Sequence, residues 1–204
     1  TQGRRGMLWD VKNRKKIGVI AGGQRIDRPW FTRDASLLFV SLRDRGGSIQ
    51  GFRTTDGKQA TKLIPIENRV NRPFYVHEPR KGVRRITAGN FNNGTFNLWD
   101  AVSGKTIGAE LTASEESAMV DLDVSSNDRF IGATYADGTL ALWSSEDGKL
   151  VYQTKVPGGP VYFSGGRRNY MVVTATSGRM FGWVDVSAES IEVKTQETEY
   201  LIDD

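Results

Sequence analysis

The stretch Gly-Thr-Phe-Asn-Leu-Trp-Asp at residues 94–100 decides the fold, because related versions of it recur along the chain. One aromatic residue anchors each copy: Trp9, Phe52, Trp99, Trp143 and Trp183. The spacings between successive anchors are 43, 47, 44 and 40 residues. A Gly-Lys turn follows three of the anchors, at residues 57–58, 104–105 and 148–149. Repetition at this period predicts a row of similar units stacked on one another.

The copy around Trp143 shows the content of one unit most clearly. Apolar residues alternate with polar ones from residue 120 to 125, which predicts a strand. Further strands are predicted at 130–135, 140–143 and 150–155, joined by hairpin turns at Asp137-Gly138 and Asp147-Gly148. Each unit therefore holds four antiparallel strands. No segment has a sustained helical period, so the chain is predicted to be all-β.

These repeats resemble the WD40 family. The resemblance rests on residues 94–100, on weaker copies at 6–10, 138–144 and 178–184, and on the three Gly-Lys turns, and it extends from about residue 6 to 196. It implies a β-propeller in which each repeat forms one four-stranded blade. The Gly-His dipeptide that opens many WD40 repeats is absent, since His77 is the only histidine.

The first copy begins at its third strand, so about four and a half blades are visible. We expect residues 1–204 to form one propeller segment, a fragment of a longer propeller or a chain that another segment completes. The anchors Trp99 and Trp143 are predicted to be buried between blades, with the turns 104–105 and 137–138 exposed. The tryptophans in general, Trp9 and Trp30 included, are expected to serve the core.

Composition excludes several kinds of chemistry. The chain has no cysteine, which removes disulfides, thiolate catalysis and cysteine metal sites. A single histidine excludes sites with several histidines, and we interpret His77 as a structural residue that is either solvated or hydrogen-bonded. No phosphate-binding glycine motif occurs. The acidic run 121–128 superficially resembles a calcium loop, but its alternating apolar residues indicate a strand. We therefore expect no metal, no cofactor and no enzymatic activity.

Charge is distributed unevenly along the chain. Residues 1–100 carry 20 Lys/Arg against 8 Asp/Glu, whereas residues 101–204 carry 8 against 16. We expect partners to meet loop charges and the first-strand positions near the channel mouth. The candidate partner-binding residues are Lys12, Arg14, Lys15, Lys16, Arg28, Trp30, Arg43, Arg45, Tyr75, Arg80, Lys81, Asp121, Asp123 and Tyr162.

The favoured function is a non-catalytic scaffold that docks other proteins or other domains of the same chain. The alternative is a propeller that binds nucleic acid or ribonucleoprotein through its basic loops, which the sequence pI of about 9.4 favours. A further alternative is a propeller hydrolase. No membrane association is expected, and the location favoured is the cytoplasm, with the nucleus as the alternative in a eukaryotic cell.

Overall fold

The computed structural model describes residues 6–42, 47–66, 74–78, 84–125 and 127–155, and the backbone of the strands at 161–165, 170–175, 180–185 and 192–197. Strands account for almost all of its regular structure, and one 3₁₀ turn lies at Ala21–Gly23. The all-β prediction is confirmed. Within the described residues, no helix is long and apolar enough to cross a membrane.

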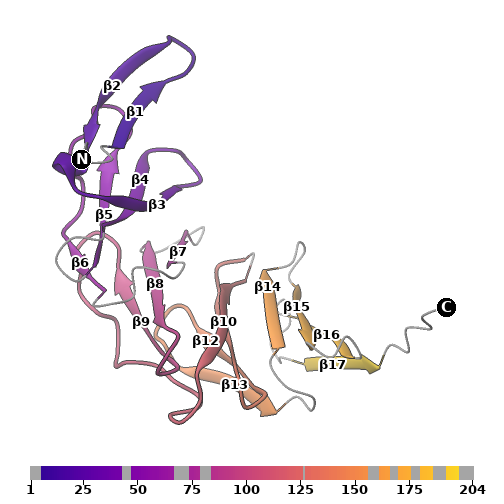
Figure 1. Ribbon diagram of the computed structural model, residues 1–204. Helices are drawn as coiled ribbons and strands as arrows, with labels where there is room; N and C mark the ends of the chain where they lie inside the picture. Colours follow the sequence, from indigo (N-terminus) through magenta and orange to yellow (C-terminus); the bar gives the residue numbers. More distant parts are fainter. Residues whose placement is uncertain are drawn as a thin grey trace. The chain divides into compact units, whose positions relative to one another are not determined.

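The strands form five antiparallel sheets in chain order (Figure 1). A two-stranded sheet joins β1 (Gly6–Asp10) to β2 (Lys15–Ile20). The second sheet contains β3 (Ile26–Phe31), β4 (Leu37–Leu42), β5 (Ser48–Arg53) and β6 (Ile64–Pro65). The third contains β7 (Phe74–His77), β8 (Arg85–Asn90) and β9 (Thr95–Asp100). Where the other blades have a fourth strand, this third sheet has two isolated bridges beside β9. These bridges pair Trp99 with Thr106 and Phe96 with Leu111.

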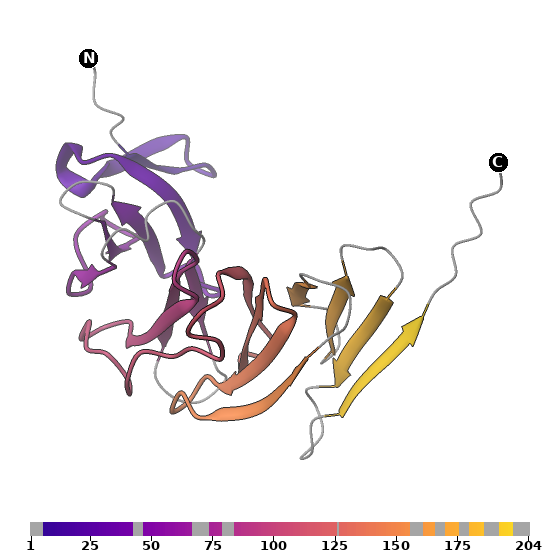
Figure 2. The same ribbon diagram turned by 60° about the horizontal axis from the view of Figure 1, so that its bottom comes forward.

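The remaining two sheets each contain four strands. One is made of β10 (Met119–Val124), β11 (Phe130–Tyr135), β12 (Thr139–Ser144) and β13 (Leu150–Lys155). The other is made of β14 (Val161–Gly165), β15 (Tyr170–Ala175), β16 (Met180–Asp185) and β17 (Glu192–Glu197), drawn from orange to yellow in Figure 2. The strands predicted around Trp143 are all present within one or two residues of their expected bounds.

The chain divides into two compact units. The first comprises Thr1–Ala88 and Trp99–Thr106, and the second comprises Gly89–Leu98 and Ile107–Asp204. The boundary runs through β8 and β9. Each unit has apolar packing between successive sheets, and the anchors Phe52, Trp99 and Trp143 belong to it.

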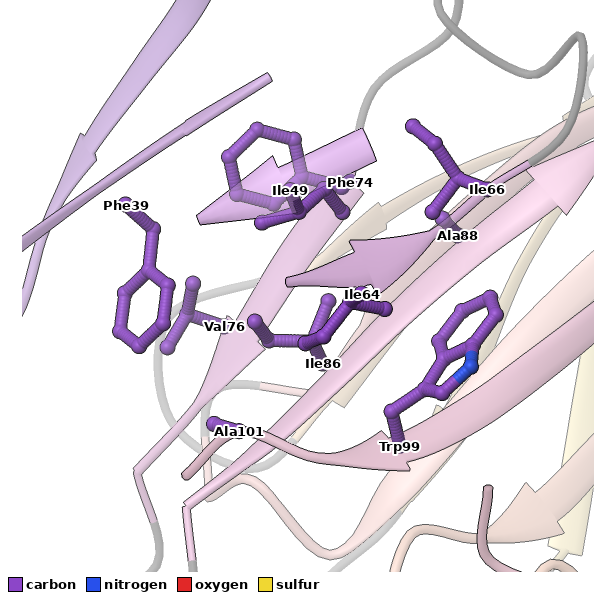
Figure 3. Packing of buried hydrophobic residues seen from close by; sticks show 10 residues of the cluster. All are labelled: Phe39, Ile49, Ile64, Ile66, Phe74, Val76, Ile86, Ala88, Trp99 and Ala101. Carbon is purple, nitrogen blue, oxygen red and sulfur yellow. The ribbon is translucent and has the colours of Figure 1, made fainter. Parts of the chain in front are cut away.

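In the first unit, Trp99 is 3% exposed and belongs to a cluster of ten buried apolar residues. Ile64 and Ile86 lie between Phe39 and the Trp99 ring in the close view of this cluster (Figure 3). Ile64 comes from β6 and Ile86 from β8, so the cluster joins two successive sheets. Phe52 lies in a second cluster, with Leu8 of β1, which joins the sheet of β3–β6 to the β1–β2 sheet.

In the second unit, Trp143 is 2% exposed. Its ring packs edge-to-face on Phe96 of β9, with 4.8 Å between the ring centroids and an interplanar angle of 83°. An edge-to-face contact brings the positive ring edge to the negative face of the other ring. The predicted burial of Trp99 and Trp143 between sheets is confirmed. The side chain of the last anchor, Trp183, lies outside the described side chains.

The first anchor corrects the sequence interpretation. Trp9 was expected in the core, but its side chain is 52% exposed. Leu8 is buried against the second sheet, and Trp9 follows it across a register shift in the β1–β2 pairing. Trp9 therefore belongs to the exposed face of this sheet, together with Met7 and its cross-strand partner Val19. Trp30, also expected in the core, is 39% exposed.

Two hairpin turns show why glycine follows an Asn or Asp in the repeat. Gly94 has φ +69°, and a Cβ there would lie 2.3 Å from the backbone oxygen of Ser117. Gly138 has φ +83°. Both are left-handed conformations that favour glycine.

The turn at 137–138 was predicted to be exposed, but only Asp137 is exposed, because Gly138 is buried. At the other predicted turn, Lys105 is exposed and Gly104 is half-buried.

We predict that Trp99→Ala and Trp143→Ala each lower the free energy of unfolding by about 3–5 kcal/mol, because each leaves a cavity between two sheets. The matched control is Arg28→Ala, whose exposed side chain should contribute less than about 0.5 kcal/mol. Urea denaturation followed by circular dichroism measures all three. Parental stability in Trp143→Ala would contradict the packing described here.

Candidate interaction surface

The strand β3 exposes two large aromatic side chains, Trp30 and Phe31, in the first unit. It lies at the edge of its sheet, beside β4 only. Four consecutive residues, Arg28–Phe31, are exposed. Pro29 fits this place because proline has no N–H for a ladder hydrogen bond and is confined to edge strands and bulges. A register shift between Ile26 and Pro29 locally interrupts the β3–β4 ladder, and there Arg28 N–H donates to Ser41 Oγ at 3.1 Å.

Trp30 and Tyr75 form an aromatic pair between the first strands of two successive sheets. Their ring centroids are 6.1 Å apart, at an interplanar angle of 68°. Tyr75 is half-buried, and Trp30 keeps 39% of its surface exposed. Both were predicted as partner-binding positions, and the structure brings these two together. Aromatic rings with one apolar face and one polar tip are enriched where proteins bind each other.

The loop after β3 is held by hydrogen bonds to Asp34. Its Oδ1 accepts from Thr32 Oγ1 at 2.8 Å, from Ser36 N–H at 3.0 Å and from Ser36 Oγ at 2.8 Å. Donation from Ser36 N–H and from the two hydroxyls holds the pKa of the Asp34 carboxyl well below its usual value, and the charge of Arg84 acts in the same direction. The carboxylate therefore stays ionised in the folded chain.

Arg84 joins this loop to the third sheet. Its Nη2 lies 2.8 Å from Asp34 Oδ2, and its Nε lies 3.2 Å from Glu78 Oε1. The backbone N–H of Arg33 donates to the other oxygen of Glu78. Glu78 directly follows β7, and Arg84 directly precedes β8. The end of β3 is thus tied to the end of β7, and these are the two strands that carry the aromatic pair.

Asp34, Glu78 and Arg84 were not among the predicted site residues, although a repeated turn motif indicates the first. Ser125 and Asn127 repeat the arrangement of Thr32 and Asp34 in the second unit, with a Ser125 Oγ to Asn127 Oδ1 distance of 2.7 Å. Ala35 and Asp128 both have a left-handed backbone conformation. Two residues after Ala35, the N–H of Leu37 donates to the Thr32 hydroxyl at 3.0 Å. Two residues after Asp128, the N–H of Phe130 donates to the Ser125 hydroxyl, also at 3.0 Å. The motif is therefore Ser/Thr-x-Asp/Asn before the second strand.

The basic hairpin between β1 and β2 presents its charges to solvent. All four predicted cations are exposed: Lys12, Arg14, Lys15 and Lys16. In the described part of the chain, none of them forms a salt bridge. Asp10 orders the turn by accepting Asn13 N–H at 3.0 Å and Asn13 Nδ2 at 2.6 Å, which lowers the pKa of its carboxyl.

The predicted acidic positions lie in the second unit. Asp121 and Asp123 are half-buried on β10. Each accepts the N–H of the next residue, at 3.0 Å from Leu122 and at 2.7 Å from Val124. The acidic run was interpreted as a strand with its turn, and β10 confirms this. Over the residues that the structure describes, no group of three or more His, Asp or Glu side chains could hold a metal ion.

The other predicted site residues cannot be placed. Arg43, Arg45, Arg80 and Lys81 lie outside the described residues, and only the backbone of Tyr162 is described, in β14.

His77 is a structural, hydrogen-bonded residue, which was one of the two predicted alternatives; the other, a solvated residue, is wrong because the side chain is buried. It is fully buried at the end of β7, with Nε2 at 2.6 Å from Thr87 Oγ1. Burial lowers the pKa of the imidazole to about 3, because the charged form loses its hydration, and the positive charge of Arg85 adds to this effect. The ring is therefore neutral near pH 7.

No protein-family model matches the sequence, and no curated protein matches it. Solved structures do. The β-propeller domain of Cps50 (Swd1) from Myceliophteria thermophila superposes with a TM-score of 0.66 at 13% identity, over 99% of this chain and 68% of that chain. The computationally designed protein Ika8 matches with a TM-score of 0.62 at 13% identity, over 96% of this chain and 57% of that chain. This chain has a β-propeller fold.

At this identity the likeness establishes the fold alone, and at that level it confirms the resemblance to WD40 repeats. Each four-stranded sheet is a propeller blade, with the anchor aromatic on its third strand. Propeller geometry assigns β3, β7, β10 and β14 to the first strands of their blades. The Trp30–Tyr75 pair therefore joins the first strands of two neighbouring blades.

We predict that His77 makes stability fall with acidity. Between about pH 6.5 and its folded pKa of about 3, the unfolded chain binds the proton that the folded chain excludes. The free energy of unfolding should therefore decrease by up to about 1.4 kcal/mol per pH unit over that range. His77→Gln, which keeps a donor for Thr87, should lose this dependence. Urea denaturation of both proteins near pH 7 and near pH 4.5 measures it, and equal losses would contradict a neutral buried imidazole.

Proposed function

We propose that this propeller is a non-catalytic interaction module that binds a protein partner, or another domain of the same polypeptide, through the first strands β3 and β7. The observation that carries the proposal is the exposed edge strand Arg28–Phe31 with the Trp30–Tyr75 pair beside it. Large aromatic side chains supply much contact area and lose little rotamer freedom on binding, which makes them frequent centres of binding energy.

Preorganisation also supports binding at this place. The ion pairs of Arg84 with Asp34 and Glu78 join the loop after β3 to the residue that follows β7, so the position of this loop is fixed before association. These ion pairs are partly exposed, so each contributes little to global stability. Their role in the proposal is to fix loop geometry next to the aromatic pair.

The described residues also favour binding over catalysis. His77, the only histidine, is buried and neutral, and it is hydrogen-bonded to Thr87. The lowered pKa values of Asp34, Asp56 and Asp147 come from turn hydrogen bonds and neighbouring cations. Carboxylates of this kind are already engaged in structure, whereas a general acid needs a raised pKa.

We predict that Trp30→Ala with Tyr75→Ala removes partner binding while the fold is kept. Affinity capture with residues 1–204, from a nuclease-treated extract of the source cells, should recover a specific set of proteins. The double variant should reduce that set by about 30-fold, the equivalent of about 2 kcal/mol for an aromatic hot spot.

The matched control is Leu63→Ala with Val102→Ala, which truncates two exposed apolar residues elsewhere in the first unit, 51% and 55% exposed. It should capture the same proteins as the parent. A thermal melt of each variant checks folding. Equal capture by the aromatic variant and the control would refute binding through β3 and β7.

The basic hairpin favours nucleic-acid binding as the second candidate. Its four cations are exposed on one short turn, and no acidic side chain of the described chain pairs with them. Four such charges could contact successive phosphates. Against this candidate, the one aromatic residue adjoining the hairpin is Trp9, on β1, and a stacking platform for single strands needs several.

We predict that duplex DNA, if it binds, does so with an affinity that falls steeply with salt. Each phosphate neutralised contributes about −0.9 to the slope of log K against log salt, so loss of all four cations should reduce the slope by up to about 3.6. Fluorescence anisotropy of the parent and of a variant with Lys12, Arg14, Lys15 and Lys16 changed to Ala measures the slope. No binding by the parent at low salt would remove this candidate.

A further inference from the structure

Two hairpin turns of the second unit share the pattern Asn/Asp-Gly-Thr, at residues 93–95 and 137–139. In the later turn, Asp137 Oδ1 accepts the Thr139 N–H at 2.9 Å, and Asp137 Oδ2 accepts the Thr139 hydroxyl at 3.0 Å. A carboxylate has two oxygens, so each donor of the threonine has an acceptor of its own.

The earlier turn has an amide in the same place. Asn93 has one side-chain oxygen, and this Oδ1 accepts both the N–H of Thr95 at 3.3 Å and its hydroxyl at 2.9 Å. Two donors therefore converge on the carbonyl oxygen of an exposed side-chain amide. Such donors stabilise the negative charge that develops on a carbonyl oxygen when a nucleophile attacks its carbon, as in an oxyanion hole.

A nucleophile follows directly in the chain. Asn93-Gly94 is the only Asn-Gly pair in the sequence, and the Gly94 nitrogen closes a five-membered ring when it bonds to Asn93 Cγ. Glycine has no side chain to shield this nitrogen. At the equivalent place of the later turn, the Gly138 N–H donates to the Tyr135 carbonyl oxygen at 3.0 Å. Over the residues that the structure describes, the Gly94 N–H has no such acceptor.

We propose that Asn93 is a site of self-deamidation, at which the turn itself supplies the nucleophile and the oxyanion donors. The Gly94 nitrogen bonds to Asn93 Cγ and loses its proton to water. The bond from Cγ to Nδ2 breaks, and Nδ2 gains a proton and leaves as ammonia. Water then opens the resulting imide ring. The net change replaces ammonia by water, and nothing is oxidised or reduced.

The turn accommodates aspartate better than isoaspartate. Breaking the new bond between Cγ and the Gly94 nitrogen gives aspartate, which has two oxygens for the two donors of Thr95, as Asp137 has for Thr139. Breaking the original main-chain bond gives isoaspartate, which adds a methylene to the main chain beside Gly94. A Cβ on Gly94 would lie 2.3 Å from the backbone oxygen of Ser117, so the main chain has little room to move there. We therefore expect mainly aspartate, which adds a negative charge to this exposed turn.

The test follows the mass of the peptide that contains residue 93. The 204-residue chain is incubated at mildly alkaline pH and body temperature, and samples are digested and analysed by mass spectrometry. Deamidation raises the mass by one unit, and fragmentation separates residue 93 from Asn90, Asn92 and Asn97. Because the folded turn supplies the oxyanion donors, residue 93 should deamidate at least as fast in the folded chain as in a synthetic peptide of residues 90–97.

Variants of Thr95 test the oxyanion donors. Thr95→Val keeps the shape of the side chain and removes the hydroxyl donor, so deamidation at residue 93 should slow by about fivefold, the equivalent of one modest hydrogen bond. Thr95→Ser keeps the hydroxyl and should retain the parental rate. Thr139→Val, the matched change at the later turn, should also leave the rate at residue 93 unchanged. A thermal melt of each variant checks folding.

Asp137→Asn tests the nucleophile, because it places a second Asn-Gly-Thr turn in the same molecule. Residue 93 should deamidate about fivefold faster than residue 137 in this variant, since the hydrogen bond to Tyr135 engages the Gly138 N–H.

Three results would overturn the proposal. These are slower deamidation in the folded chain than in the peptide, equal rates in Thr95→Val and the parent, and equal rates at residues 93 and 137 in Asp137→Asn. None of these measurements involves a partner or the Trp30–Tyr75 surface. Their outcome is therefore independent of the proposed function.

Discussion

The packing of one large side chain per repeat against the preceding sheet is the constraint on which this structure depends. Trp143 packs on Phe96, Trp99 lies in a cluster with Ile64, and Phe52 lies in a cluster with Leu8. Facing sheets are about 10 Å apart, and a gap of that width needs large apolar side chains to be filled without voids. Because each blade is stabilised mainly by its neighbours, stability is a sum of local contacts along the chain.

This arrangement leaves Arg28–Phe31 on the first strand β3 exposed to solvent. β3 contributes a single edge to its sheet, so exposed residues such as Arg28 and Trp30 cost the fold little. The loops at its end are ordered by local polar contacts, with Asp34 accepting from Thr32 and Ser36 and pairing with Arg84. In the proposed function, stability and recognition thus depend on different strands of the same blade.

Local patterns predicted most of the architecture from particular residues. Asp137-Gly138 marked a hairpin because glycine adopts positive φ without strain, and alternation from residue 120 marked a strand because side chains alternate across a sheet. Trp99 and Trp143 were predicted to be buried because each is the aromatic anchor of a repeat that stacks on its neighbours. Trp9 carries the same motif and is exposed, because burial depends on what lies opposite the residue and the motif does not encode that. The contacts of Glu78 and Arg84 link segments far from Asp34 in the chain, so no local pattern indicated them.

The sequence by itself determined the all-β class, the repeat period, the anchor positions and the chemistry that a chain with one histidine and no cysteine cannot perform. These properties follow from composition and from spacing between near neighbours. Only the tertiary structure decided which residues share a surface. It brought Trp30 to Tyr75, and it tied Arg33 and Asp34 to Glu78 and Arg84. Such juxtapositions depend on the register and stacking of strands distant in the chain, which are fixed by the cooperative packing of whole sheets.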